Sequence, residues 1–373
     1  MKITIRQNIL NEHLNNVIKG ISGKNIIPIL NCIKLSLSDK GLYLMSTDNE
    51  IAIKSFIPAK DIEEIKELGD IVVSGRLFHE IVRKLSGQLI NIEELIDSKL
   101  SIYTTTSSFT LNCNDSNEFP DLELENSEEP IKIDKKVFKN IINQTIFATS
   151  TQESRPVLTG VNFKFYDNKL ECTATDSYRL AKKEITLENN LMNKYNIIIP
   201  TKNLNELIRM FKEEDEQIEL HIFNNKIIFK FDSIEMLSRL INGEYPDTSK
   251  LIPQDFSLII DVNLKDFFNA IDRASLLTSE NDKNTIRFET KNDQVIISSN
   301  IPEIGYVEET LNIKKNNNKE LKIAFSSKYM LDALRAMESE EISLMFNGDV
   351  KPIILKNPKN DNLLQLILPI RTY

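Results

Sequence analysis

The sequence has little of what marks membrane, secreted or disulfide-bonded proteins. None of its apolar runs approaches the roughly 20 residues that span a bilayer, and the N-terminus alternates like a strand instead of showing the apolar stretch of a signal peptide. Its three cysteines, Cys32, Cys113 and Cys172, are an odd number at wide spacing, which favours buried free thiols over a disulfide or a zinc site. We therefore expect a cytoplasmic protein that has no membrane partner.

Catalytic signatures are equally scarce. The segment Gly20–Asn25 is only faintly like a phosphate loop, because two residues separate its glycines and Asn25 replaces the hydroxyl that would hold magnesium. The three histidines, His13, His79 and His221, share no metal-ligand spacing and fall in expected helices or a strand. The sequence therefore predicts neither an enzyme nor a bound metal or cofactor.

What the sequence does contain is a unit repeated three times. Lys202 follows Arg76 by 126 positions, and Lys328 follows Lys202 by another 126 (202 − 76 and 328 − 202). Each basic residue comes just after an apolar strand-like run and opens a segment of helical periodicity. A proline connector, Glu118–Asp121, recurs as Glu244–Asp247. We place the borders there, which predicts three domains over residues 1–125, 126–252 and 253–373.

The patterns inside each unit predict an α+β fold. Each unit shows two helical segments and about eight strands, many of them joined by hairpin turns. The second unit illustrates the order, with helices expected over Lys135–Ser150 and Leu204–Phe211 and strands over Gly160–Tyr166 and Lys169–Thr175. We expect three repeated domains, each with two helices packed on antiparallel sheets.

The second helix of each unit is basic on the face opposite its apolar stripe. In the first unit, Phe78, Ile81, Val82 and Leu85 have the spacing of a buried face. The opposite faces of the three helices carry Arg76 and Arg83, Lys202 and Arg209, and Lys328 and Arg335. The first helices add further basic residues, Lys135, Lys136 and Lys139 among them.

Two explanations of these basic residues remain open. They pair with Glu80, Glu206 and Asp332 one turn away, or their threefold recurrence marks a surface for a polyanion. The chain carries a net charge of −9 and a pI near 5.2, so we expect contact with nucleic acid to be weak. Tryptophan is absent and no recognition-helix motif occurs, which argues against readout of bases.

Four motifs in a fixed order give the sequence a specific resemblance. They are Ala174–Ala181, Tyr245–Asp247, Ile27–Leu30 and Leu368–Arg371. Together with the repeat, they make the whole chain resemble the bacterial sliding clamp, the beta subunit of DNA polymerase III. The resemblance implies a head-to-tail homodimeric ring, threaded by double-stranded DNA, that tethers the replicative polymerase subunit and other proteins and has a clamp loader as a partner.

A geometric estimate agrees with a dimer. Six helices with neighbours about 8–10 Å apart give a circle of helix axes roughly 15–19 Å across, which leaves no room for a duplex. Twelve helices from two chains give roughly 30–38 Å and a bore of at least about 20 Å. Two chains therefore make the smallest ring that admits DNA, and its closure requires a heterologous contact.

The resemblance also implies a peptide-binding groove between the second and third domains. Its apolar side chains suit short motifs carrying Leu or Phe, while Thr175, Arg179 and Arg371 offer polar anchors. Taken singly, each position fits a core or turn role as readily. The matching positions are Leu158, Thr175, Ser177, Tyr178, Arg179, Leu180, Pro246, Leu251, Leu366, Leu368, Pro369, Ile370 and Arg371.

Further positions follow from the same resemblance. Lys24 and Gln152 fall in loops that match DNA-contacting loops. A strand edge over Ser101–Asn112, with Phe109 and Leu111 on one face, is the candidate ring contact and would meet Leu276 and Leu277 of the partner subunit. The alternative function is an acidic three-domain scaffold that binds peptides in the groove and does not encircle DNA, and an enzyme is a distant third hypothesis.

Overall fold

The computed structural model describes residues 1–23, 25–188, 191, 193–212 and 217–371. Within them, the chain divides into two compact units. The first comprises Met1–Lys135 and Lys202–Leu240, and the second Lys136–Thr201 and Ile241–Tyr373. This division runs through the middle segment of the repeat, so the three domain borders remain a prediction. In the part of the chain described, none of the helices is long and apolar enough to cross a membrane.

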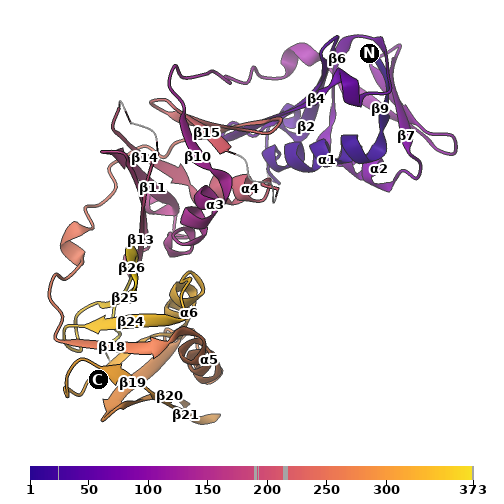
Figure 1. Ribbon diagram of the computed structural model, residues 1–373. Helices are drawn as coiled ribbons and strands as arrows, with labels where there is room; N and C mark the ends of the chain where they lie inside the picture. Colours follow the sequence, from indigo (N-terminus) through magenta and orange to yellow (C-terminus); the bar gives the residue numbers. More distant parts are fainter. Residues whose placement is uncertain (24, 189–190, 192, 213–216, 372–373) are drawn as a thin grey trace. The chain divides into compact units, whose positions relative to one another are not determined.

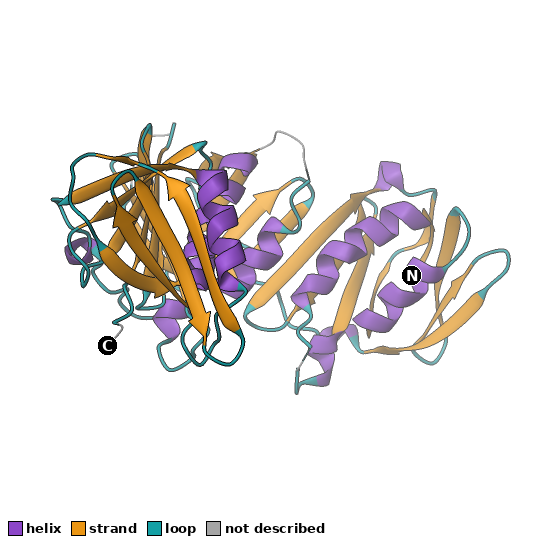
Figure 2. Cartoon of the chain, turned by 90° about the horizontal axis from the view of Figure 1, so that it is seen from below, coloured by secondary structure: helices purple, strands orange, loops and turns teal. Residues whose placement is uncertain are grey.

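The first unit is built on one sheet of thirteen antiparallel strands, in the order β10-β15-β16-β17-β4-β3-β2-β6-β9-β8-β7-β1-β5. Helices α1 (Gln7–Val17) and α2 (Gly75–Lys84) pack side by side on one face of it (Figure 1), and Figure 2 shows both in front of the strands. The strands are β1 (Lys2–Arg6), β2 (Cys32–Ser38), β3 (Gly41–Thr47), β4 (Ile51–Pro58), β5 (Glu64–Glu67), β6 (Gly69–Ser74), β7 (Leu89–Leu95), β8 (Lys99–Tyr103), β9 (Ser108–Asn114), β10 (Ile131–Asp134), β15 (Gln217–Ile222), β16 (Lys226–Phe231) and β17 (Ile234–Arg239).

The second unit contains two sheets. Nine strands run in the order β14-β11-β12-β13-β26-β25-β24-β18-β22, and four in the order β21-β20-β19-β23. They are β11 (Gly160–Tyr166), β12 (Lys169–Thr175), β13 (Arg179–Thr186), β14 (Tyr195–Pro200), β18 (Leu258–Asn263), β19 (Thr285–Lys291), β20 (Gln294–Ile301), β21 (Gly305–Asn312), β22 (Lys314–Lys315), β23 (Lys322–Ser326), β24 (Glu341–Phe346), β25 (Ile353–Asn357) and β26 (Asn360–Ile367).

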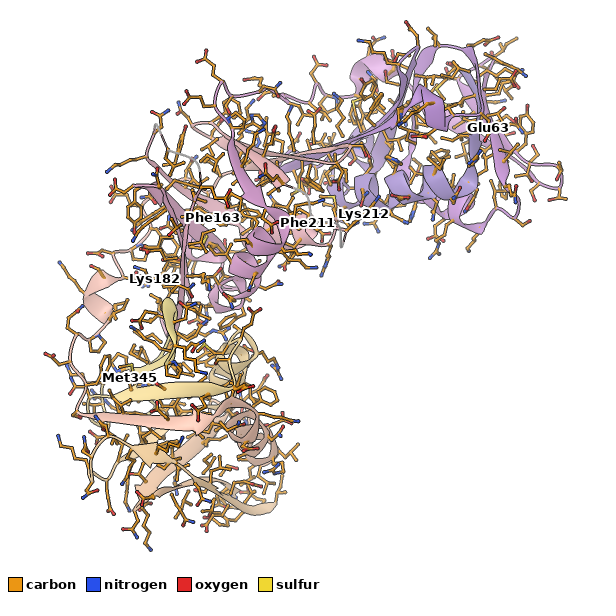
Figure 3. The ribbon with its side chains drawn as sticks, in the orientation of Figure 1. Glu63, Phe163, Lys182, Phe211, Lys212 and Met345 are labelled. Atoms are coloured by element: carbon orange, nitrogen blue, oxygen red, sulfur yellow. The ribbon has the colours of Figure 1, made fainter. Side chains whose placement is uncertain are left out.

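Helices α5 (Leu264–Ser275) and α6 (Ser327–Arg335) pack against each other in this unit, over a core of buried aromatic rings. Phe288 lies at its centre, 6.2 Å from the ring of Phe267 and 5.6 Å from that of Phe346. Helix α3 (Lys135–Asn143) packs on the nine-stranded sheet through Phe138, whose ring centroid lies 6.1 Å from that of Phe163 on β11. Phe163 is labelled in Figure 3. The apolar residues that recur with helical spacing in the sequence are thus buried together beneath the helices.

The predicted order of strand and then helix is confirmed in all three repeats. β6 leads directly into α2, β14 into α4 (Thr201–Ile208), and β23 into α6. The predicted strands over Gly160–Tyr166 and Lys169–Thr175 are β11 and β12, joined by Asp167 and Asn168. Both turn residues have positive φ angles, 46° and 57°, which the tight two-residue hairpin requires and which Asp and Asn tolerate.

Two helix predictions were wrong at their ends. The helix expected over Lys135–Ser150 stops at Asn143, where the N–H of Thr145 donates to the carbonyl of Ile142 at 3.0 Å, three residues back instead of four. The Thr145 hydroxyl donates to the carbonyls of Ile141 and Ile142, at 2.8 and 3.2 Å, and a 3₁₀ turn follows. The helix expected over Leu204–Phe211 begins earlier and ends at Ile208. The spacing of apolar residues stays helical beyond the last helical hydrogen bond. A prediction based on that spacing therefore makes these helices too long at their C-terminal ends.

The three cysteines are free thiols, as predicted. Cys32 and Cys172 are buried, and Cys113 is half-buried. Burial raises the pKa of each thiol, so all three are protonated at neutral pH.

Candidate functional site

A cleft of about 700 Å³ opens on the second unit, a size that accommodates part of a peptide. Five of the predicted peptide-binding residues line it, and they are mainly apolar or aromatic: Tyr178, Leu368, Pro369, Ile370 and Arg371. Tyr329, on the first turn of α6, faces them across the cleft as a further aromatic wall.

Strand pairing brings these distant segments together. β13 runs antiparallel to β26, with Arg179 opposite Ile367 and Leu180 opposite Leu366, so Tyr178 and Leu368 meet at the ends of their strands. The backbone N–H of Leu368 donates to the carbonyl of Tyr178 at 2.9 Å. The segment Leu368–Arg371 is therefore held beside the turn at Tyr178 by main-chain hydrogen bonds, which fixes two walls of the cleft.

The turn that carries Tyr178 is stabilised by its own side chains. One carboxylate oxygen of Asp176 accepts from the N–H groups of Tyr178 and Arg179, at 2.9 and 3.0 Å. The Thr175 hydroxyl donates to the carbonyl of Arg179 at 2.6 Å and accepts from the N–H of Ser177 at 3.1 Å. Ser177 has a φ of 77°, and the resulting turn leaves Tyr178 60% exposed, available to a ligand.

Thr175 and Arg179 do not fit the prediction that they offer polar anchors to a peptide. Thr175 is buried, and its hydroxyl is used within the turn. The Arg179 side chain is only 10% exposed, donates to Asp176 at 3.0 Å and to Asp332 at 2.7 Å, and lies 4.6 Å above the ring of Tyr329. Both residues hold the turn in place, so among the three expected anchors only Arg371 is exposed.

The remaining predicted peptide-binding residues do not line the cleft in the described part of the chain. Leu158, Leu180 and Leu366 are buried. Ser177 is exposed on the turn before Tyr178. Pro246 and Leu251 are exposed, on the segment that follows Tyr245. The Tyr245 hydroxyl accepts from the N–H of Thr175 at 2.9 Å, which attaches this segment to the end of β12.

The basic residues of the second helices are exposed in every repeat: Arg76, Arg83, Lys202, Arg209, Lys328 and Arg335. The local ion pairs that formed the simpler explanation are also present, since Arg83 contacts Glu80, Arg209 contacts Glu206 and Arg335 contacts Asp332, at 2.7, 3.0 and 3.2 Å. Exposed pairs of this kind contribute about 0–1 kcal/mol, so a phosphate can replace the carboxylate at small cost.

The other three second-helix cations behave differently. Lys202 pairs with Asp48 at 3.1 Å. Within the described residues, no carboxylate pairs with Arg76 or Lys328. The two explanations are therefore compatible: half of the second-helix cations carry a local partner one turn away, and two have none.

Of the first-helix cations, Lys135 was wrongly placed on the exposed face. It is 2% exposed and pairs with Asp232 at 2.9 Å. Lys136 and Lys139 are exposed and, with Arg335, line a second cleft of about 520 Å³ between α3 and α6. Gln152 and Lys328 share a small polar cleft of about 170 Å³ beside Tyr178. Lys24 lies outside the described residues.

The predicted strand edge over Ser101–Asn112 is a hairpin of two strands, β8 and β9, and not a single strand. The Thr104 hydroxyl makes its turn by accepting from the N–H groups of Thr106 and Ser107, at 3.3 and 3.2 Å. β9 pairs with β6 only through Cys113 and Asn114. Its stretch from Ser108 to Asn112 thus has an unpaired edge in the described residues, and Phe109 and Leu111 lie on one face of it.

Leu276 and Leu277, the expected partners of that edge, follow the last turn of α5. Leu276 is 78% exposed, and Leu277 is half-buried. The neighbouring β21 is the outer strand of the four-stranded sheet, paired only with β20 among the described strands. Exposed leucine beside an open strand edge is typical of an interaction surface.

The sequence matches one family along its whole length. It matches the DNA polymerase III beta subunit in three segments, the N-terminal domain over residues 1–123, the central domain over 132–247 and the C-terminal domain over 249–371. The chain belongs to the family of beta sliding clamps. The beta sliding clamp of Staphylococcus epidermidis is 42% identical over 377 residues, and that of Bacillus subtilis 42% over 378, with both chains fully covered in each case.

Solved structures of sliding clamps show the same fold. The crystal structure of the DNA polymerase sliding clamp from Bacillus subtilis superimposes with a TM-score of 0.97 at 41% identity, and the DNA polymerase III beta chain from Streptococcus pneumoniae with 0.96 at 34%, both with full coverage of the two chains. The three repeated α+β segments predicted from the sequence are therefore clamp domains.

Among the described residues, sequence reasoning missed five that line the clamp's cleft and assigned a sixth, Lys328, to DNA alone. The five are Glu280, Lys283, Asn284, Ser326 and Tyr329. Tyr329 directly follows Lys328 in the third repeated segment. Its place in the first turn of the expected helix, close to the end of the preceding strand, was a signal that could have identified it. Lys283 lies in the polar segment between α5 and β19 and gave no signal. It reaches the cleft because the carbonyl of its neighbour Asn284 accepts from the N–H of Ser327 at 2.8 Å.

Proposed function

We propose that this sliding clamp closes as a head-to-tail homodimeric ring around double-stranded DNA and tethers the replicative polymerase subunit through short peptide motifs. The clamp loader and other proteins with such motifs use the same cleft. The ring contacts phosphates and not base edges, so it has no sequence specificity. It acts in the cytoplasm by binding alone, as a non-catalytic processivity factor without a cofactor.

The observation that carries this proposal is the threefold recurrence of exposed cations on the second helices. Arg76, Lys202 and Lys328 occupy equivalent positions at the starts of α2, α4 and α6, on a chain with a net charge of −9. Cations that recur at equivalent positions of three helices suit a polyanion, while the net negative charge of the chain disfavours tight binding elsewhere. A scaffold that only binds peptides would not require cations at equivalent positions of all three helices.

Encirclement explains why weak phosphate contacts suffice. A ring retained by its closed shape does not need a low dissociation constant, and contacts that exchange readily let it move along the duplex. A polymerase attached to such a ring remains at a high effective concentration near the DNA end and rebinds before it diffuses away. The local ion pairs of Arg83, Arg209 and Arg335 support this mobility, because the carboxylates compete with phosphate.

Ring closure uses the two open strand edges. The β9 edge with Phe109 and Leu111 meets β21 and the exposed leucine pair after α5, Leu276 and Leu277 of the partner subunit. Because the two surfaces differ, the contact is heterologous and repeats until the circle closes. The turn Thr104–Ser107 carries no charge, so apolar packing and main-chain hydrogen bonds stabilise the contact.

Light scattering tests the assembly. At micromolar concentration the protein should have twice the mass of the 42.9 kDa chain. A stable monomer under these conditions would contradict the ring and leave the peptide-binding scaffold as the better account.

A further inference from the structure

The cleft of about 520 Å³ between α3 and α6 has the size of a small-molecule site. One face of α3 and the turn after it lines this cleft with six residues at helical spacing: Lys136, Lys139, Asn140, Asn143, Gln144 and Phe147. Along the chain the cations come first, the carboxamides follow, and the aromatic ring comes last. Because a helix rises about 1.5 Å per residue, α3 alone presents about 10 Å of cationic and then amide surface.

The α3–α6 cleft is positively charged. Its lining contains three cations and two carboxylates, which leaves one positive charge in excess on a chain whose net charge is −9. The three cations, Lys136, Lys139 and Arg335, are all exposed. Among the described residues, no carboxylate pairs with Lys139. This local potential suits an anionic ligand.

The two carboxylates of the cleft already have hydrogen-bond donors. Asp332 accepts from Arg179 at 2.7 Å and from Arg335 at 3.2 Å. Glu338 accepts from the side-chain amide of Asn140 at 2.9 Å. The Arg179 side chain is only 10% exposed, so its charge is poorly screened by water and further offsets that of Asp332. Both carboxylates therefore oppose an anion less than free carboxylates would.

Gln144 is the most buried residue of the described cleft lining. It is 3% exposed, and its Oε1 has no hydrogen-bond partner among the described residues. A buried acceptor without a donor is destabilising and indicates that a partner is missing. The exocyclic amino group of a nucleobase is a donor of the required kind. An ionised phosphate is not, because its oxygens only accept.

We propose that the α3–α6 cleft binds a nucleoside polyphosphate, with its phosphates against Lys136, Lys139 and Arg335 and its base among the carboxamides. This inference goes beyond the proposed function, since neither encirclement of DNA nor peptide docking requires a free nucleotide. The DNA backbone offers the same phosphate chemistry, and Arg335 is among the residues proposed to contact it. A backbone phosphate leaves the Oε1 of Gln144 without a donor, which favours the free nucleotide.

Fluorescence titration of the full chain with mant-ATP, at low salt with EDTA and without DNA, tests the proposal. Unlabelled ATP should displace the probe, whereas tripolyphosphate and adenosine should each need at least about tenfold higher concentrations, because each makes only part of the contacts. Equal displacement by ATP and by tripolyphosphate, or by a linear duplex at the same phosphate concentration, overturns the nucleotide assignment. Failure of mant-ATP to bind overturns it as well and leaves the ring and peptide docking untouched.

Two exposed substitutions distinguish the two ends of the site. Lys139→Gln should weaken the binding of ATP and of tripolyphosphate about fivefold, because both lose a charged contact. Asn143→Ala should weaken ATP about threefold and leave tripolyphosphate unchanged, because only the base reaches the carboxamides. Lys265→Gln, an equal charge change on α5 outside the cleft, should alter neither affinity. Wild-type ATP affinity in both cleft variants overturns the proposal, and so does an equal loss in the Lys265→Gln control.

Discussion

Arg179 donates a hydrogen bond to Asp332 at 2.7 Å, which ties the turn beside the peptide cleft to helix α6. The second oxygen of Asp332 accepts from Arg335 at 3.2 Å, on the face predicted to meet DNA. One carboxylate thus supports residues of both candidate surfaces. Arg179 is nearly buried, so its charge depends on Asp332 and Asp176 for compensation.

Asp332→Asn should therefore destabilise the protein and loosen the cleft. Replacing a carboxylate that pairs with a nearly buried arginine should cost about 1–2 kcal/mol in the free energy of unfolding, since Asp176 retains part of the pairing. Urea unfolding measures the change, and peptide affinity should fall with it. Asp349→Asn, at an exposed carboxylate without a hydrogen-bond partner among the described residues, is the matched control. Equal stability of the two variants would show that the pair has no structural role.

Tyr178→Ala should weaken peptide binding about tenfold without altering stability. The ring is exposed and lines the cleft. Its removal therefore reduces the contact area with a bound peptide but removes few contacts within the folded protein. Anisotropy with a labelled Leu-Phe peptide measures the affinity, and thermal unfolding measures the stability. Tyr178→Phe, which retains the ring, should bind nearly as well as the wild type. Unchanged affinity of the alanine variant would place the peptide elsewhere.

Leu111→Asp should convert the dimer into a monomer. The substitution puts a charge on the open edge of β9, where the proposed contact buries an apolar face. Light scattering should then give the mass of a single chain, while circular dichroism stays that of the folded protein. Ile96→Asp, at an exposed isoleucine in the turn after β7, should remain dimeric. A Leu111→Asp protein that stays dimeric would exclude this edge from the interface.

The free energy of unfolding should decrease as the pH falls below about 6.5, before the carboxylates take up protons. His221 is buried, and its Nδ1 accepts from the N–H of Ser127 at 3.0 Å, an arrangement that needs the neutral ring. Burial lowers the pKa of His221 below 6.5, so the unfolded chain binds the proton more readily than the folded one. The stability is complete above about pH 6.5 and is lost as the pH falls towards the lower folded pKa. His13 and His79 shift in the same direction, also through burial.

Urea unfolding at pH 7.5 and pH 5.5 measures this loss. The wild type should be less stable at pH 5.5, and His221→Gln, which cannot take up a proton, should narrow the difference. The substitution itself costs stability at both pH values, so the comparison concerns the pH dependence and not the absolute free energy. The same pH dependence in both proteins would exclude His221 as a source.

The sequence predicted the repeated elements well, because local patterns determine them. The apolar stripe of Phe78, Ile81 and Val82 is buried as its spacing required, and Asp167 and Asn168 form the hairpin that their residue types favour. The misplaced residues depend on contacts far away in sequence. Lys135 has the spacing of an exposed lysine, yet its side chain is buried and pairs with Asp232, almost a hundred residues later.

The candidate site was predicted in part for the same reason. Tyr178 and Leu368–Arg371 were found through their motifs, and the pairing of β13 with β26 brings them together. The role of Arg179 was missed because Asp332, 153 positions later, takes the donors that a peptide would need. Lys283 was missed because contacts distant in sequence bring its segment to the cleft: the hydrogen bonds between Asn284 and Ser327 and the pairing of Thr285 with Ser326.

Retention on DNA of different topology tests encirclement most directly. The clamp is loaded by its clamp loader onto a nicked circular plasmid, separated from free protein, and half of the sample is cut once with a restriction enzyme. We predict that the clamp stays on the circular plasmid even at a salt concentration that disrupts its contacts with the phosphates. On linear DNA it should slide off the ends. Equal retention on circular and linear DNA would contradict the ring and show ordinary binding instead.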